Sequence, residues 1–271
     1  MSSSLTENSP SSTRVVTVVG ILNVTPDSFS DGGRYFDPSI AVAKGLELFS
    51  DGAQIVDVGG ESTRPGATPI SIEEEIRRVV PVIEELSRYG RVSIDTFKAE
   101  VAVAAIAAGA SQINDISSTL FDVAAQYGVG WVAMHMKGTP TNMQKNPTYE
   151  DVVDEVLSYL DKKVAIARRL GIEEIYVDPG IGFGKTMDHN LQLLAALPRF
   201  TNLGAPVYIG TSRKGFLGKL IGEVEGVDAA PTDRIEGNLA TVAWSISNGV
   251  SALRVHDVKE TCDYISLAGL A

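Results

Sequence analysis

The chain has 271 residues, 44% of them hydrophobic, which is enough apolar surface for a full globular core and unlike a disordered protein. Its formal net charge of −11 argues against a nucleic-acid-binding surface, which needs a basic face, and means that an anionic substrate must be held by a local cluster of cations. No apolar run approaches the roughly 18 residues of a membrane span, and the single cysteine, Cys262, leaves no intramolecular disulfide, which favours a cytoplasmic location.

The chain begins with a segment, residues 1–14, that is rich in serine and threonine and lacks the apolar run of a signal peptide. We expect a disordered N-terminal tail over 1–14, followed by a single domain over 15–271.

Short apolar runs that end in a polar residue recur along the rest of the chain and predict parallel strands buried on both faces. Eight such runs occur, at 15–23, 54–58, 91–95, 111–115, 131–135, 174–178, 206–210 and 251–255. A glycine precedes each run after the first, as expected for the residue that ends a helix, and these are Gly52, Gly90, Gly109, Gly128, Gly171, Gly204 and Gly249.

The segments between these runs have helical periodicity. One apolar stripe is formed by Ile76, Val79, Val80, Ile83 and Leu86, and another by Val153, Val156, Leu157, Leu160 and Val164. Asp37 before Pro38 is typical of a helix start, and Ser71 with Glu74 predicts a capping box.

Eight alternating strand and helix units in one chain of this length favour a closed (β/α)8 TIM barrel. An open doubly wound sheet is the alternative, but no G-x-G-x-x-G motif follows the first strand. In a barrel of this kind the active site lies at the carboxyl ends of the strands.

Polar residues stand at every predicted strand end. They are Asn23; Asp57 with Glu61 and Arg64; Asp95; Asn114 with Asp115; His135; Asp178; Ser212 with Arg213 and Lys214; and Arg254 with His256. Any one of them could simply cap a helix or pair with a neighbouring charge, but four aspartates around one rim are unusual for that purpose.

Two groups of these residues predict two halves of a ligand. Asp95, Asn114 and Asp178 are acceptors suited to a flat ligand with an N–H-rich edge. Lys214, Arg254 and His256 follow the seventh and eighth strands, where this fold commonly binds phosphate. We expect an anion there.

Two other patterns carry less weight. The stretch DPGIGFGKT resembles a phosphate-binding P-loop, but Pro179 occupies the position of its first glycine. The three histidines, His135, His189 and His256, lack metal-ligand spacing, so a zinc site is not expected.

Several longer motifs at the strand ends resemble the dihydropteroate synthase family of folate biosynthesis. They are GILNVTPDSFSDGG, GGESTRPGA, SIDT, IND, MHMKGTPTNMQ, DPGIGFGKT, SRK and RVHDV, in order from about residue 15 to the C-terminus. The resemblance implies a transferase that joins 6-hydroxymethyl-7,8-dihydropterin diphosphate to 4-aminobenzoate, releasing pyrophosphate and forming 7,8-dihydropteroate through a pterin-methylene cation.

The resemblance also implies roles for individual residues. Asp95, Asp178, Lys214, Arg254 and His256 are the implied catalytic residues. The pterin site would comprise Asp95, Asn114, Ile116, Met136, Asp178, Phe183 and Lys214. The diphosphate would be bound by Asn23, Thr63, Arg254 and His256, with Asn23 coordinating Mg²⁺.

Two polar loops, residues 25–33 and 61–67, are expected to form a lid that shapes the aminobenzoate pocket and excludes water. The residues implied there are Phe29, Asp31, Thr63, Arg64, Pro65, Lys214 and Gly215, with Asp31 pairing with Arg64. The alternative for the first loop is a flexible connector.

One position departs from the family pattern, because Gly215 replaces the usual serine after SRK, which bears on aminobenzoate affinity and sulfonamide sensitivity. The alternative functions are a pterin-binding methyltransferase and a pterin-binding paralogue without turnover. A homodimer is expected by resemblance, sulfonamides are possible competitors, and neither nucleic acid nor membrane is an expected partner.

Overall fold

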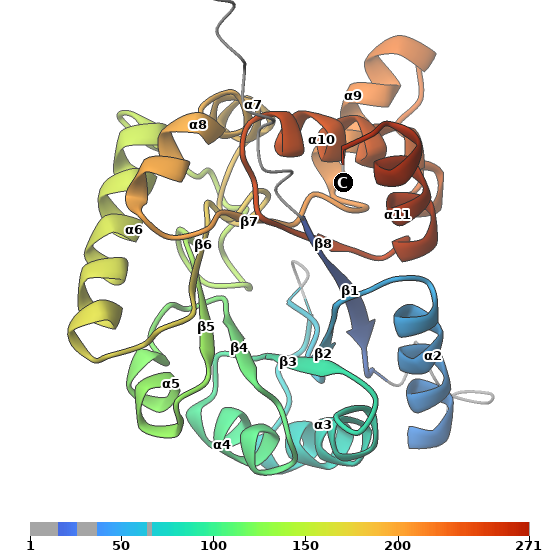
Figure 1. Cartoon of the computed structure of the whole chain (residues 1–271). Helices are drawn as coiled ribbons and strands as arrows, with labels where there is room; N and C mark the ends of the chain where they lie inside the picture. The colour runs from blue at the N-terminus through green and yellow to red at the C-terminus, as the bar shows by residue number, and fades with distance from the viewer. Residues whose placement is uncertain (1–15, 26–36, 64–66, 271) are drawn as a thin grey trace, which may run out of the picture.

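The computed structural model of the chain describes residues 16–25, 37–63 and 67–270. Its centre is a ring of eight parallel strands (Figure 1). The strands are β1 (Thr17–Asn23), β2 (Ile55–Gly59), β3 (Arg91–Asp95), β4 (Gln112–Asp115), β5 (Gly130–Met134), β6 (Ile175–Asp178), β7 (Tyr208–Ile209) and β8 (Ala252–Val255). Each lies within two residues of a predicted strand at either end.

Helices surround this ring on the outside (Figure 1). They are α2 (Pro38–Ser50), α3 (Ile72–Leu86), α4 (Ala99–Ala107), α5 (Phe121–Tyr127), α6 (Val152–Arg169), α7 (Met187–Ala195), α8 (Leu197–Phe200), α9 (Gly215–Glu225), α10 (Ile235–Ser247) and α11 (Val258–Leu267), with short 3-10 turns at Thr201–Leu203 and Pro231–Asp233. None of the helices in the described part of the chain is both long and apolar enough to cross a membrane.

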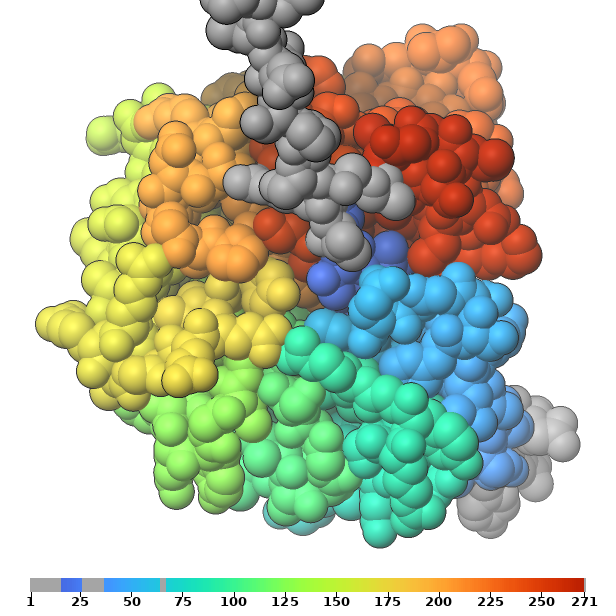
Figure 2. Space-filling model, viewed as in Figure 1, coloured from blue at the N-terminus to red at the C-terminus, as the bar shows by residue number. Residues whose placement is uncertain are grey.

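The ring of strands closes on itself. Hydrogen bonding runs in the order β6-β5-β4-β3-β2-β1-β8-β7, and a parallel bridge between Val177 and Val207 joins the two ends, with the Val177 N–H donating to Pro206 O at 3.0 Å. Figure 2 shows the outer segments in chain order round the molecule, with α2 next to α11. A Cβ on Gly52 would lie 3.0 Å from Cys262 Sγ, so the turn that follows α2 packs on α11. The prediction of a (β/α)8 barrel is therefore confirmed.

The two faces of each strand contact different surroundings. One face packs under the helices and supplies most of the core, including Val18, Val56 and Ile94. The other face points into the barrel, where Val19, Ile55, Val132, Tyr208 and Ala252 form a small inner cluster. Because side chains alternate along a strand, the inner cluster fixes which later residues of each strand face the barrel axis.

The helix start predicted at Asp37 is confirmed, and two other predicted signals need correction. Asp37 caps α2 by accepting from the Ser39 N–H at 2.9 Å, whereas the capping box at Ser71 is only half formed. Ser71 Oγ accepts from the Glu74 N–H at 3.2 Å, but the Glu74 carboxylate pairs with arginines instead of returning to the cap.

The second correction concerns the glycines before the strands. Six of the seven have a positive φ, as predicted, but Gly90 does not. A Cβ at Gly90 would lie 2.6 Å from the Phe49 ring, so close packing and not backbone conformation requires a glycine there.

Asp115 is the last residue of β4 and points outward, away from the barrel axis. It is fully buried and accepts from the Ser117 N–H at 2.9 Å, the Leu120 N–H at 2.7 Å and Trp131 Nε1 at 3.1 Å. This carboxylate organises the β4–α5 connection and belongs to the scaffold.

Replacing Asp115 by alanine leaves several buried donors without an acceptor. We expect Asp115→Ala to lower the free energy of unfolding by about 3 kcal/mol, because each unsatisfied buried donor is costly. Urea denaturation measures this, with the exposed Asp122→Ala on α5 as the control, for which the loss should stay below about 1 kcal/mol. Equal stability of Asp115→Ala and the unmodified chain would contradict the assignment.

Candidate active site

Polar side chains form the upper layer of the barrel interior, directly above the inner apolar cluster. They come from five different strands, and they are Asp57, Asp95, Asn114, Asp178 and Arg254. Asp57, Asp178 and Arg254 each come two residues after an inward position on their strands, namely Ile55, Tyr176 and Ala252. Asp95 and Asn114 stand in register with Gly59 and Val132 of neighbouring strands, so strand geometry directs all five to one opening.

Arg254 of β8 is the centre of this layer. Its Nε donates to Asp57 Oδ2 at 2.6 Å, and its Nη2 donates to Asp95 Oδ2 at 2.6 Å. Asn114 Nδ2 donates to the same Asp57 oxygen at 2.9 Å. One guanidinium therefore joins β2, β3 and β8, and its side chain keeps 20% of its surface exposed towards the mouth.

Burial and charge oppose each other in this cluster. Burial raises the pKa of Asp95 to about 7, with Asp57 adding to the rise and Arg254 opposing it. Burial would lower the pKa of Arg254, but Asp57 and Asp95 outweigh that effect and raise it. Buried Asp57 Oδ1 and Asp95 Oδ1 have no hydrogen-bond partner among the described residues, so both remain available as acceptors.

Asp178 and Lys214 form the opposite side of the opening. Asp178 is 5% exposed, accepts from the Gly180 N–H at 2.7 Å, and has a pKa raised by burial. Lys214 Nζ donates to Ile181 O and lies 4.6 Å from the centre of the Phe183 ring, a cation–π contact. Burial lowers the pKa of Lys214 to about 8 in spite of the nearby Asp178 and Asp95.

The loop after β6 is held against the end of β5 by close backbone packing. Gly180 and Gly184 have positive φ values, and Cβ atoms there would lie 1.9 Å from His135 O and 2.3 Å from Lys137 O. Only glycine fits such positions. The glycines of DPGIGFGKT thus serve the packing of this loop, in agreement with the rejection of a P-loop.

Lys185 hydrogen-bonds to the same loop from its buried side. It is 3% exposed, and its Nζ lies 3.0 Å from His135 Nδ1, 3.2 Å from His135 O and 3.0 Å from Phe183 O. Burial lowers the pKa of Lys185 to about 7 and that of His135 to about 3. His135 is therefore neutral, and it supports the site from outside the barrel interior.

Asn23 lies at the carboxyl end of β1, beside Gly59 and Asp95. A Cβ on Gly59 would lie 3.8 Å from Asn23 Oδ1 and 3.6 Å from Asp95 Oδ2. Two oxygens that could act as metal ligands therefore flank Gly59, which has no side chain to fill the space. The described residues hold no cluster of three or more histidine, cysteine, aspartate or glutamate side chains that would cage a metal. The donors fit Mg²⁺ held by one or two protein oxygens and substrate phosphates.

Ser212 and His256 meet at the ends of β7 and β8. Ser212 Oγ accepts from the His256 N–H at 3.1 Å and lies 3.1 Å from His256 Nδ1. Between Ser212 and Lys214, Arg213 adopts a φ of 59° and pairs with Asp257. Positive φ is unusual for arginine, and this turn directs Lys214 into the opening while α9 begins at Gly215.

The remaining predicted residues divide into two groups. Ile116 is buried, Met136 and Phe183 are half-buried after their strands, and Thr63 is half-buried after β2. Phe29, Asp31, Arg64 and Pro65 lie outside the described residues, so the predicted lid contacts are not observed.

Comparison with known proteins identifies the family. A family model described as "Pterin binding enzyme" matches residues 19–256. The dihydropteroate synthase of Bacillus subtilis is 46% identical over 252 residues, covering 90% of this chain and 84% of that protein. The chain belongs to the dihydropteroate synthase family.

Two solved structures of this family resemble the barrel closely. A Xanthomonas albilineans dihydropteroate synthase with 4-aminobenzoic acid has a TM-score of 0.85 and 45% identity, covering 94% of this chain and 92% of that chain. A structure of the same enzyme with 7,8-dihydropteroate has a TM-score of 0.82 and 42% identity, with the same coverage.

Asp57 belongs to the site, although the sequence analysis named it only as a residue at a strand end. It is fully buried and contacts both Arg254 and Asn114. The signal in the sequence was a polar residue within an apolar run, but only the structure shows which face it occupies, with Ile55 in the inner cluster and Val56 and Val58 in the outer core.

The buried ammonium of Lys185 predicts a measurable pH dependence of stability. Its pKa is about 7 in the folded chain and 10.5 ordinarily, so the unfolded state binds more protons between these values and stability rises with pH there. Relative to Lys185→Met, the free energy of unfolding of the unmodified chain should increase by about 3 kcal/mol from pH 7 to 9.5.

Urea unfolding of both proteins at several pH values measures this difference. Below pH 7 the difference should level off, because both states then carry the proton. A difference independent of pH between 7 and 9.5 would show that Lys185 keeps an ordinary pKa.

Proposed function

We propose that the chain condenses 6-hydroxymethyl-7,8-dihydropterin diphosphate with 4-aminobenzoate, forming 7,8-dihydropteroate and pyrophosphate. The observation that carries this proposal is the meeting of buried acceptors and cations at one opening. Asp95 pairs with Arg254 on one side of it, and Asp178 lies near Lys214 on the other.

The acceptors suit the flat edge of a dihydropterin. Asp178 and Asp95 each keep oxygen atoms buried beside the opening, and Asn114 is anchored by its bond to Asp57. A bound ring would donate its amino and ring N–H groups to these carboxylates in a charge-assisted, bidentate manner. Phe183, Met136 and Ile116 would contact the apolar faces of the ring.

The basic side chains suit the departing diphosphate. Arg254 lies in β8, His256 follows that strand, and Lys214 follows β7. Because negative charge grows on the leaving oxygen as the C–O bond breaks, cations fixed near that oxygen lower the barrier without reorganising. Asn23 would hold Mg²⁺, which would supply further neutralisation of that charge.

Carbon–nitrogen bond formation follows from the same charge arrangement. Loss of pyrophosphate leaves a pterin-methylene cation, which the buried carboxylates of Asp95 and Asp178 stabilise electrostatically. The amine of 4-aminobenzoate then attacks the methylene carbon and loses one proton. Water must be kept out, because it would otherwise capture the cation.

The carboxylate of 4-aminobenzoate fits the start of α9. Lys214 precedes this helix, and the backbone N–H groups of its first turn begin at Gly215. Helix N-termini favour anions. Thr63 lies four residues after the end of β2, and the resemblance assigns it to the same pocket.

A coupled assay for pyrophosphate release tests the proposed reaction. Release should require both substrates, and Asp178→Asn should weaken binding of the pterin substrate by about 100-fold, because it replaces a charged acceptor by a partial donor. Asp263→Asn, an exposed residue paired with Lys259 at 2.5 Å, is the matched control and should leave binding unchanged.

Other outcomes of that assay separate the alternatives. Pyrophosphate release without 4-aminobenzoate would show hydrolysis, and tight pterin binding without any release would favour a paralogue that lacks turnover. Methyl transfer from a methylated folate would favour the methyltransferase alternative.

Gly215 allows a direct test of the aminobenzoate position. A Cβ there would have no heavy atom within 4 Å, so a serine fits without displacing a neighbour. We expect Gly215→Ser to lower the KM for 4-aminobenzoate about fivefold, since one added hydrogen bond contributes about 1 kcal/mol. Steady-state kinetics measures this, and Gly215→Ala, which adds the Cβ alone, should change KM less than twofold. Equal effects of serine and alanine would place the carboxylate elsewhere.

A further inference from the structure

The connections that follow β7 and β8 lie side by side at the edge of the opening. Gly210, just after β7, stands beside Arg254, since a Cβ there would lie 3.6 Å from Arg254 Cβ. Two residues further along each connection, Ser212 contacts His256. Val255, between Arg254 and His256, belongs to the outer core. Because side chains alternate along extended chain, Arg254 and His256 both project to the inner side, where the opening lies.

The hydroxyl of Ser212 contacts two groups of His256. Its Oγ accepts from the His256 N–H at 3.1 Å and lies 3.1 Å from His256 Nδ1. A backbone N–H can only donate, so the first contact uses a lone pair of the hydroxyl oxygen. The hydroxyl proton remains for the second contact, and Nδ1 is its one acceptor within hydrogen-bond distance among the described residues. Ser212 therefore donates to Nδ1.

This hydrogen bond selects one form of the neutral His256 ring. A neutral imidazole carries a single proton, on Nδ1 or on Nε2. Because Nδ1 accepts from Ser212, the proton of the neutral ring is on Nε2. The neutral ring thus presents an N–H donor from the edge that does not contact Ser212.

Contacts within the protein hold Ser212 in place. Arg213, the next residue, pairs with Asp257, the residue that follows His256. The carbonyl of Arg213 accepts from Arg234 Nη1 at 2.7 Å. The two connections are therefore joined twice, once by Ser212 and once by the ion pair beside it. The orientation of the His256 ring is fixed before any substrate binds.

We infer that Ser212 is a positioning residue, which holds neutral His256 with its proton on Nε2 and so directs an N–H donor at the departing diphosphate. This inference rests on the proposed function. The donor would meet the leaving oxygen as negative charge grows on it, without a change of tautomer or a rotation of the ring. Without the hydroxyl, the ring loses the contact that selects this tautomer and this orientation.

Nitrogen-15 NMR of the histidine side chains tests the tautomer directly, because protonated and unprotonated ring nitrogens have widely separated shifts. The chain has 3 histidines, and His256→Gln assigns the signals of His256. We expect an unprotonated Nδ1 in the neutral ring of the unmodified chain without substrates. His189 is an internal reference, because its Nδ1 accepts from the Thr186 N–H at 3.2 Å. A protonated Nδ1 in neutral His256 would overturn the inference.

Kinetics of Ser212→Ala and Ser212→Thr test the positioning role. We expect Ser212→Ala to lower kcat about tenfold and to change the Kd of dihydropterin diphosphate less than about threefold, because the donor acts mainly on charge that develops as the bond breaks. Ser212→Thr keeps the hydroxyl and should recover most of the loss. Ser266→Ala, at an exposed serine of α11, is the matched control and should change neither constant. An unchanged kcat in folded Ser212→Ala would overturn the positioning role, as would an equal loss of pterin affinity.

The NMR signals separate this inference from the proposed reaction. In Ser212→Ala, the Nδ1 shift of His256 should move towards that of a nitrogen without a hydrogen bond. If this shift moves but the unmodified chain forms no dihydropteroate, the proposed reaction fails and the bond from Ser212 to Nδ1 stands. If the unmodified chain is active and its neutral His256 carries the proton on Nδ1, the inference fails alone. The tautomer in the unmodified chain decides if Ser212→Ala does not fold.

Discussion

The bond of Arg254 to Asp57 and Asp95 is the interaction on which the active site depends. A barrel interior this narrow excludes most water, and two carboxylates buried there would repel each other without a cation between them. Arg254 supplies that cation from β8 and fixes three strands at the level of the opening. Because the guanidinium is planar and its donors are fixed, it also sets the direction in which each carboxylate presents its remaining oxygen.

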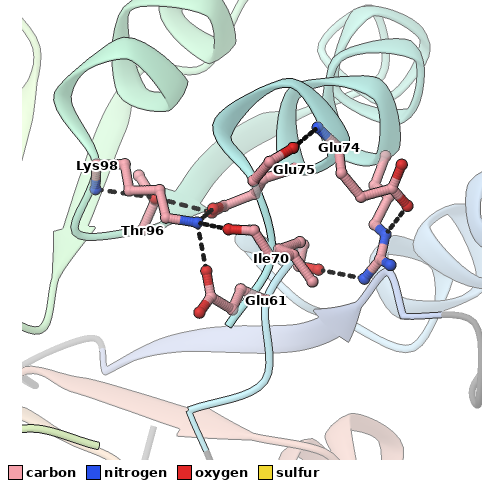
Figure 3. A network of polar contacts seen from close by, with 9 residues as sticks. Glu61, Ile70, Glu74, Glu75, Thr96 and Lys98 are labelled. Atoms are coloured by element: carbon pink, nitrogen blue, oxygen red, sulfur yellow. Dashed lines mark hydrogen bonds and ion pairs between the residues drawn. The ribbon is translucent and has the colours of Figure 1, made fainter. Parts of the chain in front are cut away.

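The residues around the opening are therefore of two kinds, those on strands and those on connections. Acceptors and Arg254 lie on strands, whose positions the closed sheet determines. Lys214, Phe183 and Thr63 lie on connections, and charged side chains hold these connections: Lys185 under the β6–α7 loop, Arg213 in the turn before α9, and Lys98 between Glu61 and Ile70 (Figure 3). The sheet therefore fixes the positions on strands, whereas these side chains fix positions on the connections.

These three contacts share a physical feature, which is a lysine or arginine bonded to backbone carbonyls or to carboxylates. Lys185 has only neutral partners and its pKa falls, whereas Lys98 has two carboxylates and its pKa rises. Keeping Lys185 charged costs folding free energy, whereas removing Lys98 would leave its two carboxylates, Glu61 and Glu75, without a cation. Stability near neutral pH and the geometry of the opening are therefore linked through the same few side chains.

The sequence by itself determined the alternation of strands and helices, the barrel, and the set of strand ends from which Asp95, Asn114, Asp178 and Arg254 reach the opening, because glycine stops and apolar runs are local signals. It assigned Asn114 to the opening but gave no role to the neighbouring Asp115, since both faces of a barrel strand are buried and the pattern marks neither as inner. Only the tertiary structure decided that Asp57 joins the site, that Asp115 and His135 support it from outside, and that Lys98 binds Glu61. These choices depend on contacts between residues up to 197 positions apart, which no local pattern encodes.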